Sequence, residues 1–280
     1  MNIQKISHLL GYVIIVVAMQ CNAGDLSNDV RNGTHSPIRT DDSYIELGMG
    51  FSVGTNPFYG LPEGNEPGEI SAELEMGVNL HLQYHGWFME AFSESLEVAT
   101  LGYNFADTNH WSFDLVGLPQ HPELSGHVSK DLEGIRPRHI DFMSGPRVTG
   151  YLGNYIVQLH ALTDISNTHN GQVLSAKIAR HWQYKNWNFH AIGGLSYRSN
   201  KAADYYLSVE AEDATEKFPE FYAQAGFVQV YEIGTTYPLS KKWVFRTSVQ
   251  HYALDSQWSG SPLLVSTNVS KLLMSINYVF

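Results

Sequence analysis

Apolar and polar residues alternate along several segments of about ten residues. The clearest is 73–84, where one face carries Leu74, Met76, Val78, Leu80, Leu82 and Tyr84 and the other carries Glu73, Glu75, Gly77, Asn79, His81 and Gln83. Residues 43–53, 187–198 and 271–280 repeat the pattern. Because successive side chains of a β-strand point to opposite faces, each segment predicts a strand with one apolar and one polar face.

Twelve segments of this kind predict an all-β fold, a transmembrane antiparallel β-barrel with its N- and C-termini in the periplasm. They cover residues 43–53, 72–84, 87–94, 97–105, 111–118, 139–152, 155–166, 172–184, 187–199, 225–238, 243–257 and 268–280. We divide residues 87–105 into two strands rather than one, because bacterial barrels have an even number of strands. A soluble β-sandwich with one wet face would alternate in the same way, so alternation alone leaves both folds open.

The connections between the predicted strands fall into two classes. On one side they are short: His85-Gly86, 106–110, Gly153-Asn154, Lys185-Asn186 and 239–242. On the other side they are mostly long: 54–71, 119–138, 200–224 and 258–267, with a short Asn-Gly loop at 167–171. Short periplasmic turns and long extracellular loops are typical of outer-membrane barrels, so the connections favour the barrel over the sandwich.

Tryptophan is concentrated beside the short connections. Trp87, Trp111, Trp182, Trp187 and Trp243 each lie within three residues of one of them. A periplasmic girdle of amphipathic rings at the headgroup level explains this placement, whereas a sandwich does not. The chain ends in a strand that finishes with Tyr278 and Phe280. This ending looks like the C-terminal signal of barrels that the barrel assembly machinery inserts into the outer membrane.

The start of the chain predicts export. A positive residue and an apolar run precede small residues up to Ala23, which indicates a secretory signal peptide over residues 1–23. A lipoprotein with lipid on Cys21 is the alternative. Residues 24–42 are polar, and we expect a flexible periplasmic leader there, followed by the barrel over 43–280. No later stretch holds 18 consecutive apolar residues, so the sequence predicts no membrane-spanning helix.

Charge and cysteine content narrow the class of protein. The formal net charge is -11, which argues against a nucleic-acid partner, since such a protein would present a basic face. Only 16% of the residues are charged and 24 are glycine, unlike a disordered acidic chain. One cysteine excludes an intrachain disulfide framework and a cysteine zinc site.

The polar faces of the predicted strands bring charges of both signs into the lumen. The inward titratable residues are Glu46, Glu73, Glu75, Asp114, Asp141, Arg147, His160, Asp164, Lys177, His181, His190, Arg198, Glu232, Arg246 and Lys271. An unpaired charge away from bulk water is costly, so we expect ion-pair networks that partly close the bore. Two interpretations stay open: a structural plug of salt bridges, or a narrow and weakly selective pore.

The sequence holds no motif that predicts a catalytic, cofactor or metal site. His81 and His85 are four residues apart, but on a strand this spacing separates them by about 13 Å, too far for one metal ion. One enzymatic alternative is a lipid hydrolase on the outer wall. His251 is predicted to face outward near the extracellular rim, with Ser270 on the next strand as the candidate nucleophile.

One strand motif resembles a known family. The run Gly145-Pro146-Arg147, followed by a glycine-rich hairpin, is similar to the "GPR" strand of the MipA/OmpV family, the MltA-interacting outer-membrane proteins. Segments 204–209, 222–227 and 237–243 and the ending 277–280 resemble that family's loop and last hairpins. The resemblance covers residues 40 to 280 approximately, and it is weakest over 54–138.

The resemblance implies a monomeric outer-membrane barrel without catalytic activity. The best known member is a scaffold that links a lytic transglycosylase to a penicillin-binding protein in murein synthesis, and other members are regarded as porin-like or adhesive surface proteins. We therefore expect a scaffold in the cell outer membrane, in contact with lipid and lipopolysaccharide. A narrow porin-like channel and a surface adhesin are the alternatives.

Overall fold

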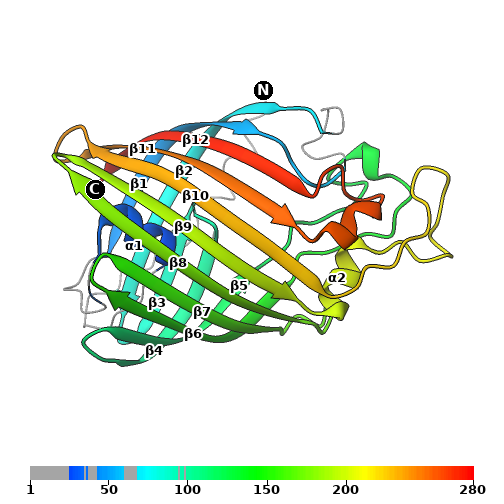
Figure 1. Ribbon diagram of the computed structural model, residues 1–280, viewed down its shortest axis with the longest axis horizontal. Coiled ribbons are helices and arrows are strands. Elements are labelled where there is room, and N and C mark those ends of the chain that lie inside the picture. Colours follow the sequence, from blue (N-terminus) through cyan, green and yellow to red (C-terminus); the bar gives the residue numbers. More distant parts are fainter. Residues whose placement is uncertain (1–24, 35, 37–42, 60–67, 94, 98) are drawn as a thin grey trace, which may run out of the picture.

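The chain forms one closed antiparallel barrel of twelve strands (Figure 1). The computed structural model describes residues 25–34, 36, 43–59, 68–93, 95–97 and 99–280. The strands are β1 (Tyr44–Gly54), β2 (Ser71–Tyr84), β3 (Trp87–Phe92), β4 (Ala99–Asp107), β5 (Trp111–Pro119), β6 (Phe142–Leu152), β7 (Tyr155–Asp164), β8 (Gln172–Tyr184), β9 (Trp187–Arg198), β10 (Gly226–Pro238), β11 (Trp243–Leu254) and β12 (Asn268–Val279). Each strand pairs with its neighbours in sequence, and β1 pairs with β12 to close the cylinder. The predicted twelve-stranded barrel is confirmed.

Strands β7 and β11 end earlier than predicted because acidic side chains cap the turns that follow them. The Asp164 carboxylate accepts three backbone N–H groups of the next loop, which ends β7. The Asp255 carboxylate accepts a backbone N–H group at the start of the short helix η3 (Ser256–Gly260), which ends β11. Asp competes with a strand ladder in this way because its short side chain bonds to the backbone a few residues ahead.

The two ends of the barrel differ. At the short-turn end, hairpins as tight as His85-Gly86 join the strands, and the φ angles of these two residues are 48° and 87°. Such positive φ angles match the twist of two-residue hairpins. At the long-loop end, the connections carry helices η2 (Lys130–Leu132), α2 (Asn200–Leu207) and η3. Figure 1 shows α2 among these loops, opposite the hairpins.

The outer face of the barrel is apolar and the inner face is polar. On β1, Ile45, Leu47, Met49 and Phe51 are between 42% and 63% exposed, while Glu46 between them is 5% exposed. This distribution of apolar and polar side chains is the reverse of that in a protein folded in water. The closed sheet also leaves no strand edge with unpaired backbone groups. Lipid around the cylinder removes the apolar face from water, so the chain is a transmembrane β-barrel. Among the described residues, no helix is long and apolar enough to cross a membrane.

A short helix, α1 (Leu26–Asn32), lies inside the barrel and contacts β7, β8, β9 and β10. Asp25 caps its start by accepting the N–H group of Asn28, and Gly33 ends it with a left-handed φ of 68°. Leu26 and Val30, 1% and 0% exposed, pack on an apolar patch of the lumen wall.

The prediction of a flexible leader over 24–42 is therefore wrong for Leu26–Asn32, which form the helix α1. Its apolar residues at positions i and i+4 are buried against the lumen wall, and this burial compensates for the entropy lost on ordering. The predicted signal peptide, 1–23, lies outside the described residues, as do 24, 35 and 37–42.

Candidate functional site: the plugged lumen

The C-terminal half of α1 is held by a buried ion pair. The Arg31 guanidinium donates to the Glu232 carboxylate through Nε at 3.2 Å and Nη2 at 2.7 Å. Glu232 also lies 2.7 Å from His190 Nε2, and its other oxygen accepts from the Gln250 amide at 2.8 Å. Arg31 and Glu232 are 5% and 1% exposed, so this ion pair joins the helix to the inner wall of β10 away from bulk water.

Other polar contacts hold the rest of the helix. The Tyr151 hydroxyl on β6 donates to the Asp29 carboxylate at 2.6 Å. The backbone N–H of Asp25 donates to Glu90 on β3 at 2.9 Å, and the Ser95 hydroxyl donates to the Asp25 carboxylate at 2.8 Å. The helix is therefore bonded to strands on different sides of the lumen, and it occupies the bore as a plug.

The family-motif strand supplies the cation at the centre of the lumen. Arg147 is fully buried and donates through Nε to Asp114 at 2.9 Å and through Nη1 to Glu90 at 3.1 Å. The ladder between β6 and β7 is interrupted at Gly145 and Pro146. Proline has no N–H to donate, and a β-carbon at Gly145 would lie 2.0 Å from a β7 carbonyl oxygen. The Gly-Pro step is thus where the two strands depart from regular pairing, directly before the buried arginine.

The remaining charges predicted for the lumen form further contacts. Arg246 donates to Glu46 through Nη2 at 2.9 Å, Lys271 donates to Glu75 at 3.0 Å, and Lys177 donates to Glu97. Glu73 is exposed, and its side chain makes no polar contact to a described residue. The lumen thus contains paired charges of both signs rather than an open row of one sign.

The aromatic residues predicted as a girdle lie at the short-turn end. Trp87, Trp182 and Trp243 are 57%, 43% and 45% exposed on the outer face. Three of the tryptophans contact tyrosines on adjacent strands: Trp87 meets Tyr103, Trp187 meets Tyr237, and Trp243 meets Tyr278, with ring centroids 5.2, 4.6 and 5.0 Å apart. Trp111 begins β5 at the same end. At the end of the chain, Phe280 is 69% exposed and stacks edge-on against Tyr278.

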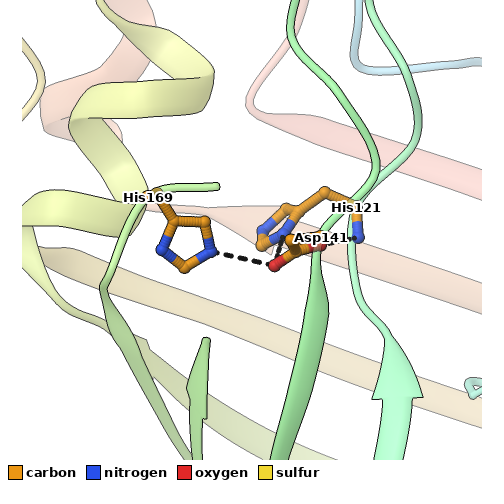
Figure 2. Close-up of side chains that lie close together, drawn as sticks. All are labelled: His121, Asp141 and His169. Carbon is orange, nitrogen blue, oxygen red and sulfur yellow. Dashed lines mark hydrogen bonds and ion pairs between the residues drawn. The ribbon is translucent and has the colours of Figure 1, made fainter. Parts of the chain in front are cut away.

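At the long-loop end, Asp141 is the centre of a hydrogen-bond cluster that includes His121 and His169 (Figure 2). Asp141 Oδ2 lies 2.9 Å from His121 Nδ1 and 2.9 Å from His169 Nε2. Its Oδ1 accepts the backbone N–H groups of Gln120 and His121. Although burial opposes ionisation, the hydrogen bonds from the two imidazoles hold the pKa of Asp141 well below its usual range.

The three residues offer ligand atoms within 4.8 Å of one another, the spacing of a metal site. The tautomers argue against a metal. Arg198 Nη1 faces His121 Nε2, and the Gly171 N–H donates to His169 Nδ1, so these two ring nitrogens are acceptors. The nitrogens that face Asp141 must then carry the protons, whereas a metal needs them bare. The cluster is built as a hydrogen-bond hub that joins the β5–β6 loop, which carries His121 and Asp141, to the β7–β8 loop, which carries His169.

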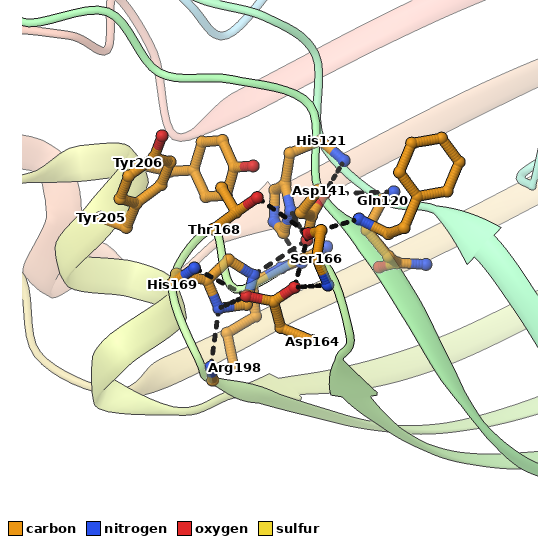
Figure 3. Close-up of polar contacts among 12 residues, drawn as sticks. Gln120, His121, Asp141, Asp164, Ser166, Thr168, His169, Arg198, Tyr205 and Tyr206 are labelled. Atoms are coloured by element: carbon orange, nitrogen blue, oxygen red, sulfur yellow. Dashed lines mark hydrogen bonds and ion pairs between the residues drawn. The ribbon is translucent and has the colours of Figure 1, made fainter.

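Figure 3 shows the surroundings of this hub. The His121 ring stacks on Tyr206 of α2 with centroids 3.9 Å apart. Burial, together with the charge of Arg198, lowers the pKa of His121 to about 4. Asp141 and Arg198 were predicted to face the lumen, but nothing in the sequence pattern pointed to His121 and His169, which lie in irregular loops. The helix α1 was also missed, although Asp25, Leu26, Val30 and Gly33 carry a helix signature.

The alternative lipid-hydrolase pair is in contact on the outer wall. His251 Nδ1 lies 2.9 Å from the Ser270 hydroxyl. A nucleophile–base pair also needs a polar group that orients the base. Within the described part of the chain, the other ring nitrogen of His251 has no such partner, so the geometry lacks this third component.

A closed cylinder with an apolar exterior and a polar, plugged interior defines an outer-membrane β-barrel protein. The family model described as "MltA-interacting protein MipA" matches residues 47–280. The chain therefore belongs to the MipA family, as the Gly145-Pro146-Arg147 strand suggested.

Solved structures similar to the chain are outer-membrane barrels of low sequence identity. The NanC porin is 10% identical, with 84% of this chain and 98% of that chain covered and a TM-score of 0.46. A "bacterial polysaccharide outer membrane secretin" is 11% identical, with 86% and 99% covered and a TM-score of 0.44. The KdgM porin is 8% identical, with 83% and 99% covered and a TM-score of 0.40. The search of curated proteins gave no match.

Proposed function

We propose that this protein is a non-enzymatic scaffold that anchors a murein-remodelling enzyme to the outer membrane. The observation that carries this proposal is the plug: α1 fills the bore and is held by the buried Arg31–Glu232 pair. A bore closed in this way does not let solutes diffuse through steadily. We therefore place the binding of partners at the turns and loops of the two rims of the barrel.

The partner we propose is a lytic transglycosylase of the MltA type, the enzyme named in the family's description. A penicillin-binding protein is proposed as a second, indirect partner. The binding surface would be the short-turn end, which we take to face the periplasm. This end presents three exposed lysines, Lys185, Lys241 and Lys242, and a recess of about 460 Å³ beside Arg31 and Asn188.

The experiment is a binding assay with the detergent-solubilised barrel immobilised and a purified MltA-type transglycosylase in solution. We expect saturable binding that weakens at least ~10-fold in the Lys241→Glu/Lys242→Glu variant. The matched control is Arg136→Glu, an exposed cation on the long-loop side, which should bind like the wild type. Absence of binding, or an equal loss in the control, would refute the scaffold.

A narrow channel is the second candidate, and one observation favours it. A cavity of about 420 Å³ lies on the long-loop side of the lumen, besides the recess at the short-turn end. If α1 left the bore, these spaces would lie on a common path. Planar-bilayer recordings separate the two functions, because a scaffold stays silent, whereas a channel shows a steady open state in the wild-type protein.

A further inference from the structure

The cavity of about 420 Å³ at the long-loop end has the features of a ligand site. We call it the vestibule cavity. Its roof is formed by α2, including Ala203 and Leu207, and by Trp258 of η3, and its lower wall includes Ser95 and Leu96 beside the plug. The volume lies within the range of about 300–1,000 Å³ of small-molecule pockets.

The vestibule cavity is cationic in an acidic protein. Arg198 and Lys271 line it, whereas none of its described lining residues is Asp or Glu. The whole chain has 28 acidic residues against 17 basic ones, so the charge of the cavity opposes the charge of the protein. Positive charge on the wall with no acidic lining residue favours the binding of an anion over that of a cation.

The two cations are compensated to different degrees. Lys271 has a carboxylate partner, since its Nζ lies 3.0 Å from Glu75. Arg198 makes no ion pair with a described carboxylate: it contacts the neutral ring nitrogen of His121, and the nearby charge of Asp141 reaches it only from the far side of that ring. A guanidinium offers five N–H donors, so Arg198 keeps donors for a ligand.

Arg198 is also held in place before any ligand arrives. Its partner His121 is fixed by Asp141 on one side and by the stacked ring of Tyr206 on another (Figure 3). A donor positioned in advance costs little conformational entropy when it binds.

The rest of the wall is suited to an apolar body. Phe58, Leu96, Leu254 and Trp258 line the cavity together with Tyr252. Aromatic and aliphatic walls with a few convergent polar groups are the usual lining of a site for an organic ligand rather than for a simple inorganic ion.

We propose that the vestibule cavity binds a small amphipathic organic anion. The anionic group, such as a carboxylate, accepts hydrogen bonds from the Arg198 guanidinium, and the apolar body packs between Trp258 and Leu254. This binding activity is separate from the scaffold proposed above, because it uses the opposite end of the barrel.

The test is isothermal titration of the detergent-solubilised full chain with naphthalene-2-carboxylate, matched by the neutral naphthalene-2-carboxamide. Both probes have the same ring and differ in charge. The partition of each probe into detergent micelles is subtracted with its own protein-free titration. We expect one saturable site for the carboxylate, with at least ~10-fold weaker binding of the carboxamide, because a charge-assisted hydrogen bond is lost.

Two variants locate the site. Arg198→Gln is expected to weaken the binding of the carboxylate at least ~10-fold. Arg136→Gln, on the outer loops, is expected to leave that binding unchanged. Leu254→Phe narrows the cavity without changing Arg198 and is expected to weaken the binding of both probes. If Arg198→Gln does not fold, this variant decides whether the vestibule cavity is the binding site. Equal affinity for the two probes, no saturable binding, or wild-type binding in Leu254→Phe would overturn the proposal.

Discussion

The Arg31–Glu232 ion pair makes a quantitative prediction about how firmly the plug is held. Substituting Arg31 by Gln keeps a hydrogen-bonding side chain but removes the cation, which leaves the Glu232 carboxylate buried without it. Breaking a buried ion pair costs about 3–5 kcal/mol. His190 and Gln250 still contact Glu232, so we take the lower value, about 3 kcal/mol. At ~1.4 kcal/mol per tenfold, the undocked population of α1 rises about 100-fold.

Hydrogen–deuterium exchange read by mass spectrometry measures this population directly. Peptides that contain α1 should exchange about 100-fold faster in Arg31→Gln, since exchange follows local opening. The matched control is Arg136→Gln. Its ion pair with Glu210 is exposed, with the two side chains 52% and 44% accessible, so its loss costs at most about 1 kcal/mol.

The double variant Arg31→Gln/Glu232→Gln removes both charges and should recover most of the protection. Unchanged exchange of α1 in the single variant would refute the reasoning, because the plug would then be held without the ion pair. An equal effect in Arg136→Gln would refute it as well, since the change would not be specific to the lumen.

Three further predictions concern the lumen centre and the Asp141 cluster. Arg147→Gln leaves Glu90 and Asp114 without their shared cation and should lower the free energy of unfolding by about 3–5 kcal/mol in urea titrations; an unchanged midpoint contradicts this. Since the pKa of His121 falls from 6.5 to about 4 on folding, the contribution of neutral His121 to the stability of the long-loop end is fully present above pH 6.5 and is lost as the pH falls toward 4. Limited proteolysis of residues 119–141 should therefore be faster at pH 5 than at pH 7.5, and His121→Gln should flatten this difference. Zinc should give no saturable stabilisation of the folded barrel; one-to-one binding that disappears in His169→Ala would show that the tautomers are not locked.

The strands were predictable because the membrane imposes one rule on each of them. A residue faces either lipid or lumen, so the period of two in 73–84 and 43–53 reports its side directly. Because bacterial barrels have an even number of strands, we divide residues 87–105 into two strands, and the structure has β3 and β4 there. The alternation predicts nothing about residues in loops, and Trp258 is an example. It lies in a long loop, and only the structure reveals that it is 1% exposed and packs against α2.

The candidate sites were less predictable because they depend on contacts between segments far apart in the chain. Asp141 could be assigned an inward position from its place near a strand. His121 lies 20 residues before Asp141 in the same β5–β6 loop and His169 lies in the β7–β8 loop, and no periodic pattern relates them. The plug was missed for a different reason: a seven-residue helix is unstable by itself, and its polar sequence resembles a disordered leader until the lumen wall is present.

The position of the plug also constrains the order in which the molecule is made. Arg31 meets an acid 201 residues later in the chain, on a strand that exists only near the end of synthesis. Because the first and last strands seal the cylinder against each other, the helix has no enclosing wall until the C-terminus is in place. The helix α1 is therefore among the last parts to settle, and a product truncated before β10 would leave Arg31 without its acidic partner.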